Sequence, residues 1–247
     1  MRVDGVLHRN SPRFFALFLL FMLWAFWPSY FTRLFEQPNI RFHLHGIALT
    51  LWCVMLVLQA QLIRTQRRAL HKQIGKLSYV LAPAVIAITI SFVHFRVAGA
   101  VPSLAQLPGF VLYFLALTLN AVVAFALFYG LAIYYRRDSQ RHARWMLCTV
   151  FPLFTPVTDR LIGAHLPSLV GFVPRIDGSP ILPVAGFVLA DLILVALALW
   201  DWRANKRADV FPVALGALLI YHVSVLTLHR VSAWHAFCAW FLSLPLS

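Results

Sequence analysis

Charge, and acidic charge above all, is what this sequence has least of. Only 12% of the 247 residues are charged, and 8 Asp and Glu stand against 21 Lys and Arg. Soluble domains carry charge on about a quarter of their residues, whereas 61% of this chain is hydrophobic and its mean hydropathy is +0.79. The composition excludes a water-soluble protein of ordinary surface polarity and makes lipid the solvent for most of the chain.

Cysteine and the familiar catalytic motifs are also scarce. The three cysteines, Cys53, Cys148 and Cys238, lie in or beside apolar segments without CxxC spacing, which is typical of small buried residues and not of a redox or metal centre. The sequence contains no HExxH, Gly-x-Ser-x-Gly or Walker A pattern, which argues against a metalloprotease, a serine hydrolase or an ATPase.

What the sequence does contain is a series of seven long apolar runs. Each approaches or exceeds the length that a helix needs to cross a bilayer, about 17 to 25 residues, and only helices satisfy their own backbone in lipid. The sequence therefore predicts an all-α bundle of seven transmembrane helices, one integral membrane domain over residues 1–247. The runs are 14–31, 42–63, 77–95, 108–135, 145–163, 181–200 and 210–229.

Lys and Arg concentrate in alternate connections: the N-terminal tail and residues 64–76, 136–144 and 201–209. By the positive-inside rule this predicts a cytoplasmic N-terminus, a C-terminus outside and a multi-pass protein of the bacterial inner membrane. The first run lacks a small-x-small cleavage site and is interpreted as an uncleaved span. Basic residues in short loops indicate topology and contact with membrane lipid, so no nucleic-acid partner is expected.

Ionisable residues within the apolar runs are the candidates for function, because each costs several kcal/mol in lipid unless it is paired or hydrated. With the predicted orientation most of them fall in the outer half of the membrane, which predicts a polar pocket open to the outside. The alternative is that each fixes helix packing by pairing with a neighbour. The candidates are His45, His94, Asp159, Arg160, Asp191 and His222.

Two histidines at the cytoplasmic side suggest a redox role. His71 and His142 each follow an Arg-Arg pair at a helix entrance, and two imidazoles from different helices can hold haem iron while Arg neutralises the propionates. His45 and His94 form a second candidate pair at the opposite face. Haem b is thus one candidate cofactor, although His71 and His142 both lie before their apolar runs and no CxxCH motif supports it. No spacing indicates which metal, if any, the outer residues would bind.

The second run and the loop after it resemble a group of bacterial multi-pass proteins without an assigned activity. The shared features are His45-Gly, Trp52 and Gln59 on one helix, followed by Arg67-x-x-Leu-His71-x-x-x-Gly. The resemblance extends to 136–146 and 191–201 and implies a seven-helix bundle. A looser similarity to cytochrome b561-like proteins depends on the helix-borne histidines. The chain departs from the group at Phe211-Pro, where His-Pro is usual.

Three functions remain open from the sequence. The first is a binding, sensing or complex-supporting bundle, which could associate with other membrane subunits. The second is transmembrane electron transfer through haem b held by His45, His94, His71 and His142. The third is proton-coupled transport of a small solute along a path lined by Asp191, His222, Asp159 and Arg160.

Overall fold

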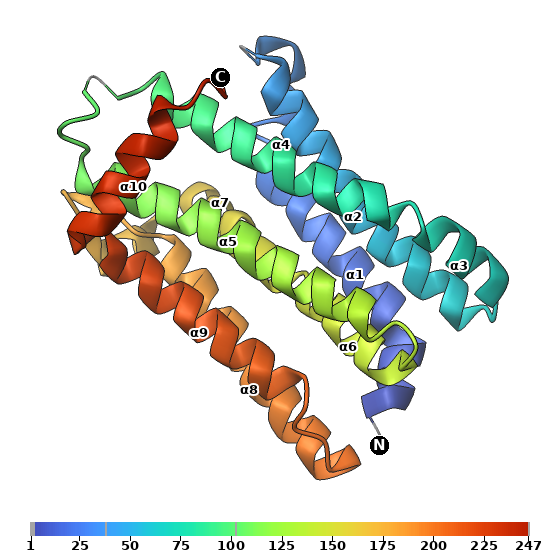
Figure 1. Ribbon diagram of the computed structural model, residues 1–247. Helices are drawn as coiled ribbons and strands as arrows, with labels where there is room; N and C mark the ends of the chain where they lie inside the picture. The colour runs from blue at the N-terminus through green and yellow to red at the C-terminus, as the bar shows by residue number, and fades with distance from the viewer. Residues whose placement is uncertain (1–2, 38, 102, 247) are drawn as a thin grey trace.

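The computed structural model describes residues 3–37, 39–101 and 103–246 and is built almost entirely from helices (Figure 1). Four short 3-10 helices and a two-stranded antiparallel hairpin lie between the longer elements. The α-helices are α1 (Val3–Phe26), α2 (Ile40–Arg64), α3 (Arg68–Gly75), α4 (Ser78–Ala98), α5 (Gly109–Tyr134), α6 (Ser139–Cys148), α7 (Phe154–His165), α8 (Pro183–Asn205), α9 (Phe211–Thr227) and α10 (Ser232–Ser243). The short elements are η1 (Phe31–Glu36), η2 (Phe151–Leu153), η3 (Pro167–Phe172), η4 (Leu228–Arg230), β1 (Arg175–Ile176) and β2 (Ser179–Pro180).

Five helical segments in the described ranges are long and apolar enough to cross a membrane, as expected of a multi-pass membrane protein. They coincide with five of the seven predicted runs, and the prediction of an all-helical chain is confirmed. The segments are Ile40–Arg64, Arg68–Ala98, Gly109–Tyr134, Pro183–Asn205 and Phe211–Arg230.

The other two predicted runs take different forms. The run at 14–31 becomes α1, which begins earlier and ends at Phe26. The run at 145–163 is divided among α6, η2 and α7, because Pro152 and Pro156 cannot donate to the helical hydrogen-bond ladder. Residues 149–153 instead form tighter bonds, including Leu153 N to Val150 O at 2.9 Å. The run is therefore two helices, α6 and α7, joined by η2.

Helix α5 is the centre of the bundle, with α8 and α9 on one side and α1, α2 and α4 on the other (Figure 1). Phe128 of α5 belongs to a core cluster with Leu194 of α8 and Leu218 of α9, all three fully buried. Phe125, one turn earlier, belongs to a second cluster with Trp52 of α2. Two cores therefore share one helix, and the elements on either side are held through it.

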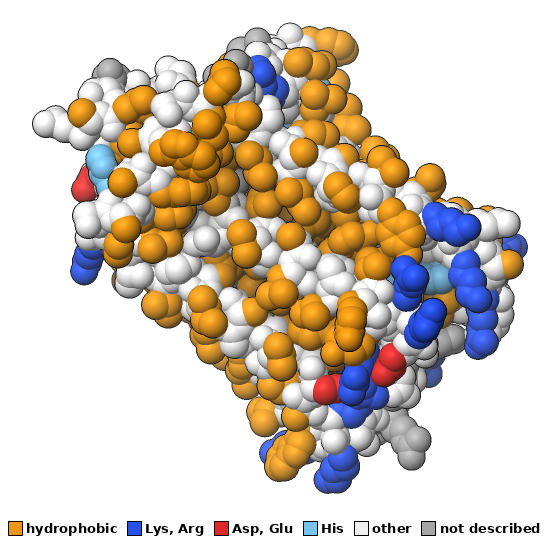
Figure 2. Space-filling view, viewed as in Figure 1, with side chains coloured by type: hydrophobic (Ala, Val, Ile, Leu, Met, Phe, Trp, Pro, Cys, Tyr) orange, Lys and Arg blue, Asp and Glu red, His pale blue; other side chains and the backbone are white. Residues whose placement is uncertain are grey.

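The basic connections gather at one end of the bundle, here called the basic end. Helix α3, the start of α6, the α8–α9 turn and the N-terminal end of α1 all lie there (Figure 1), and Figure 2 shows most of the visible Lys and Arg over this end. The opposite end holds η1 and α10. Orange side chains cover much of the surface between the two ends in Figure 2, as a lipid-facing surface requires.

Candidate functional site

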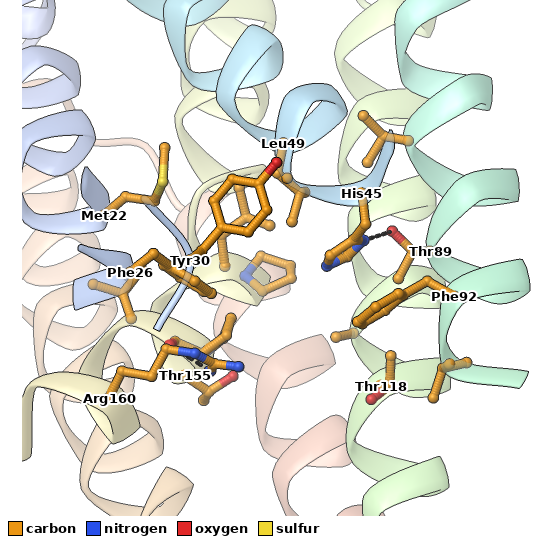
Figure 3. Close-up of a pocket in the computed structure, with 18 of the residues that line it drawn as sticks. Met22, Phe26, Tyr30, His45, Leu49, Thr89, Phe92, Thr118, Thr155 and Arg160 are labelled. Atoms are coloured by element: carbon orange, nitrogen blue, oxygen red, sulfur yellow. Dashed lines mark hydrogen bonds between the residues drawn. The ribbon is translucent and has the colours of Figure 1, made fainter. Parts of the chain in front are cut away.

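A cavity of about 420 Å³ opens between α1, α2, α4, α5 and α7 (Figure 3). Its volume lies in the range of pockets that hold small molecules. Most lining side chains are apolar, with polar groups drawn from the residues that flank η1 and from α2, α4, α5 and α7. Among the sequence candidates, His45, Asp159 and Arg160 line it. The cavity therefore has the composition of a ligand pocket: mostly apolar walls with a few polar groups.

His45 is held by α4, the helix that faces it. Its Nδ1 lies 3.3 Å from Thr89 Oγ1, and its ring stacks on Phe92 with centroids 4.5 Å apart and planes 6° from parallel. Asn39 caps α2 by accepting a hydrogen bond from the Arg41 backbone N–H, which fixes the turn that carries His45. With Nδ1 engaged, Nε2 is the polar atom that this ring keeps for a ligand.

Arg160 lies across the cavity from His45 (Figure 3), and Asp159, the residue before it, also lines the cavity. An Arg160 nitrogen lies 3.0 Å from Asp159 Oδ1 and donates to the Pro156 carbonyl at 2.9 Å. The guanidinium also lies 4.3 Å from the centre of the Phe26 ring, a cation–π contact. The Arg160 side chain keeps 41% of its surface exposed, so it is positioned by these contacts and still accessible to a ligand.

Tyr30 covers the side of the cavity next to η1. Its hydroxyl lies 3.2 Å from His43 Nδ1, and its ring lies so close to Gly46 that a Cβ there would be 2.9 Å from Tyr30 Cζ. Gly46 is thus required for the close approach of this ring to α2. The structure explains the His45-Gly46 step: His45 lines the cavity, and Gly46 leaves room for the Tyr30 ring that covers the cavity.

The remaining outer candidates lie elsewhere. Asp191 of α8 and His222 of α9 contact each other, with 3.0 Å between Asp191 Oδ2 and His222 Nδ1, and His222 stacks on Phe187. His94 is buried against Phe241 of α10. None of these three lines the cavity. The six candidates therefore occupy three separate places, and the cavity holds three of them.

At the basic end, α3 and α6 bring His71 and His142 together. Their ring centroids are 6.4 Å apart and their planes 81° from parallel. The Nδ1 of His142 lies 2.8 Å from the Ala132 carbonyl, and the side-chain amide of Gln59 is placed to donate to His71 Nδ1 at 2.5 Å. Helix α3 extends the helical structure back to Arg68, so His71 lies on a helix although it precedes its apolar run. By contrast, no described ring contact joins His45 to His94.

An ion pair that was not predicted lies nearby, between Arg144 of α6 and Asp201 of α8. Two guanidinium nitrogens donate to the two carboxylate oxygens at 2.7 and 2.8 Å, and the side chains are 0% and 3% exposed. Asn205 donates to Asp201 Oδ1 at 2.7 Å. The sequence held a signal: Arg144 directly precedes one predicted run and Asp201 directly follows another, so both lie at the same membrane depth.

Asp209, in the turn between α8 and α9, accepts from two arginines. Arg207 donates to both of its oxygens, at 3.1 and 2.7 Å, and Arg141 of α6 donates to Oδ2 at 2.7 Å. These bonds stabilise the ionised carboxylate, and the hydrogen bond from Arg207 is the main reason that the pKa of Asp209 falls to about 2. Asp209 therefore links the α8–α9 turn to α6 through its bond with Arg141.

No family model, curated protein or solved structure matches the chain. Within the described ranges, no three His, Cys, Asp or Glu residues cluster as ligands for a metal ion. The cavity and the His71–His142 pair are the two features of the described residues that suit a ligand.

Proposed function

We propose that the protein is a seven-span protein of the bacterial inner membrane with its N-terminus in the cytoplasm. The basic end supports this orientation, because it gathers the connections that the positive-inside rule assigns to the cytoplasm. The two crossings beyond the five most apolar segments are α1 and the broken helix α6–η2–α7. Both pack against other helices of the bundle: α1 contacts α2 and α7, and α7 contacts α8. The C-terminus then lies outside.

The function we propose is binding of a small amphipathic molecule in the cavity that opens toward the outer face. The observation that carries this proposal is the cavity itself: about 420 Å³, mostly apolar walls, and His45 opposite the Asp159–Arg160 pair. A purely structural bundle would fill this volume with side chains, because protein interiors pack at the density of organic crystals. The notion of a sensing or binding bundle agrees with the absence of a catalytic motif.

Filling the cavity from α5 tests the proposal. Ala121 lines the cavity, whereas Val123, two residues along the helix, is 63% exposed on the outer surface and does not line it. We expect the wild-type protein, purified gently in a neutral detergent, to carry a small molecule that native mass spectrometry detects. Ala121→Phe should lose it and Val123→Phe should retain it. Equal retention by both variants would contradict binding in the cavity.

The His71–His142 pair favours a second candidate function, electron transfer through haem b. The two imidazoles come from different helices and lie 6.4 Å apart between ring centroids, and a haem held there would take its protein ligands from these two rings. The Ala132 carbonyl holds His142 Nδ1, as in many ligating histidines. His71 fits less well, because a Gln59 amide that donates to Nδ1 leaves the proton on Nε2; ligation requires that amide to rotate.

When bound, such a haem would supply one-electron chemistry, while His71 and His142 would hold it and nearby arginines would neutralise its propionates. The test is the absorption spectrum of the purified protein, oxidised and reduced with dithionite. A Soret band that shifts on reduction and disappears in His142→Ala would support haem at this pair. His165→Ala, at the other end of the bundle, is the matched control. A colourless protein would exclude this candidate and leave the cavity proposal untouched.

A further inference from the structure

The walls of the cavity change from apolar to charged along its length. On α4 the lining runs from Val85 and Ile86, through Thr89, to Arg96. On the other wall it runs from Pro152 and Leu153 of η2 to Asp159 and Arg160 of α7. At 1.5 Å per residue the α4 wall is about 16 Å long, roughly half of the hydrocarbon thickness of a bilayer, about 30 Å. The charged groups lie at the outer mouth and the apolar walls extend toward the membrane midplane.

The charge at the mouth is unbalanced. Arg96 and Arg160 both line it, from α4 and α7, while Asp159 is the one acid among the lining residues. Asp159 is already bonded to Arg160. Arg96 lies over the Phe42 ring with 5.6 Å to its centroid, and no described carboxylate lies within ion-pair distance of it. Two arginines and one acid line the cavity, so its lining carries one positive charge in excess.

From this pattern we infer that the ligand is an amphipathic anion with one apolar chain, its head at the mouth between Arg96 and Arg160 and its chain along α4 and α5 toward the midplane. The inference depends on the proposed binding function and specifies its ligand class. An excess cation in a partly desolvated site favours a carboxylate or phosphate over a neutral or cationic head. The chain would contact Leu49, Ile86 and Phe125, which line the deeper walls.

The arrangement of Arg160 suits this role. Two of its contacts, with Asp159 and with the Pro156 carbonyl, use the same terminal nitrogen, and Phe26 covers one face of the guanidinium. The fork of donors in Arg can bind a carboxylate or phosphate with its other nitrogens while these contacts hold the side chain in place. A single chain suits a cavity of about 420 Å³ whose α4 wall is about 16 Å long.

The test compares ligands that share a twelve-carbon alkyl chain and differ in their head group. The purified full-length protein is placed in nanodiscs of zwitterionic lipid, and binding of radiolabelled dodecanoate, dodecyl phosphate, dodecanol and dodecylamine is measured above that of empty nanodiscs at pH 8. We expect saturable binding of at least one anion, at least tenfold tighter than dodecanol. Arg160→Gln should weaken anion binding about tenfold, whereas Arg33→Gln, an exposed arginine of η1 that does not line the cavity, should leave it unchanged.

Each outcome separates this inference from the proposed function. If dodecanol binds as tightly as the anions, the cavity binds a ligand, but the inference that its head group is anionic is wrong. Tighter dodecylamine would assign the head to Asp159 and overturn the inference. Absence of all binding above empty nanodiscs would contradict both proposals. A preference between dodecanoate and dodecyl phosphate identifies the source as a fatty acid or a lipid phosphate. If Arg160→Gln does not fold, Arg96→Gln must weaken anion binding instead, and unchanged affinity there overturns the inference.

Discussion

Polar side chains at the two ends of the bundle differ in their surroundings. At the basic end, Arg144 and Asp201 satisfy each other with two hydrogen bonds and almost no exposure, and Asp209 is bonded by two arginines. At the opposite end, His45 and Arg160 line a cavity, and the Arg160 side chain is 41% exposed. A polar group bonded within the protein fixes the fold, whereas one that faces a cavity is available to a ligand.

The same distinction applies between helix pairs. Helices α6 and α8 are joined by a charge pair, but α7 and α8 approach through glycine. A Cβ at Gly186 would overlap Thr158 Oγ1 and lie 3.1 Å from Thr155 Cα. Small residues allow such close backbone contact in membrane bundles. Since Thr155 also lines the cavity, this contact determines where the wall of the cavity stands.

The strongest way to test the contrast is to break the buried charge pair. Arg144→Leu should lower the free energy of unfolding by about 3 to 5 kcal/mol, because it leaves the Asp201 carboxylate buried without its partner. The measurement is the fraction of protein that remains monodisperse after graded heating in detergent. The double variant Arg144→Leu/Asp201→Leu should recover most of the loss. Arg141→Leu, at a half-exposed pair, should cost less than about 1 kcal/mol.

Gly186→Ala should have the next largest effect. The added methyl group forces α7 away from α8, and overpacking of this kind costs about 1 to 3 kcal/mol. Gly216→Ala in α9 is the matched control, since nothing lies within 4 Å of its Cβ position and Ala favours the helix over Gly. Heating curves of the two variants should therefore shift in opposite directions. A stable Gly186→Ala protein would show that α7 and α8 are not closely fixed.

Gly46→Ala should affect the outer end without loosening the basic end. The new Cβ must displace the Tyr30 ring, which lies at the protein surface and can move. We expect dodecanoate to bind several-fold more weakly, because Tyr30 no longer covers the cavity, while the melting temperature changes little. Gly130→Ala, with open space around its Cβ position, should alter neither. Equal affinity in the Gly46 variant would mean that Tyr30 does not contribute to binding.

The smallest expected effect concerns Asp209 and pH. Its pKa is about 2 in the folded protein against about 3.9 for an unperturbed Asp. Ionised Asp209 therefore stabilises the fold fully above about pH 4, and this contribution is lost as the pH falls toward 2. The difference in melting temperature between wild type and Asp209→Asn should be small at pH 6 and should shrink as the pH is lowered from 4. A difference that grows with acidity would contradict the role of this carboxylate.

Particular residues show how far the sequence could lead. Apolar length was enough to locate α2, α4, α5, α8 and α9, because any helix of this composition must be surrounded by lipid or by other helices. Pro152 and Pro156 lie within the predicted run at 145–163, but the sequence alone does not distinguish one kinked helix from two separate helices. Asp191 and His222 were expected to face the pocket. They face each other instead, because one turn of a helix can direct a side chain to any neighbour and periodicity does not identify that neighbour.

The sequence by itself determined that lipid surrounds most of this protein, that the chain is helical and that Lys and Arg concentrate in alternate connections. These properties follow from composition and from the order of residues along the chain. Only the tertiary structure decided which polar groups meet. Arg144 and Asp201 are 57 positions apart, and His45 lies opposite Arg160 because α2 and α7 pack around the same space. Pairing across a bundle depends on the rotation and depth of each helix, and these are set by side-chain packing among all its neighbours.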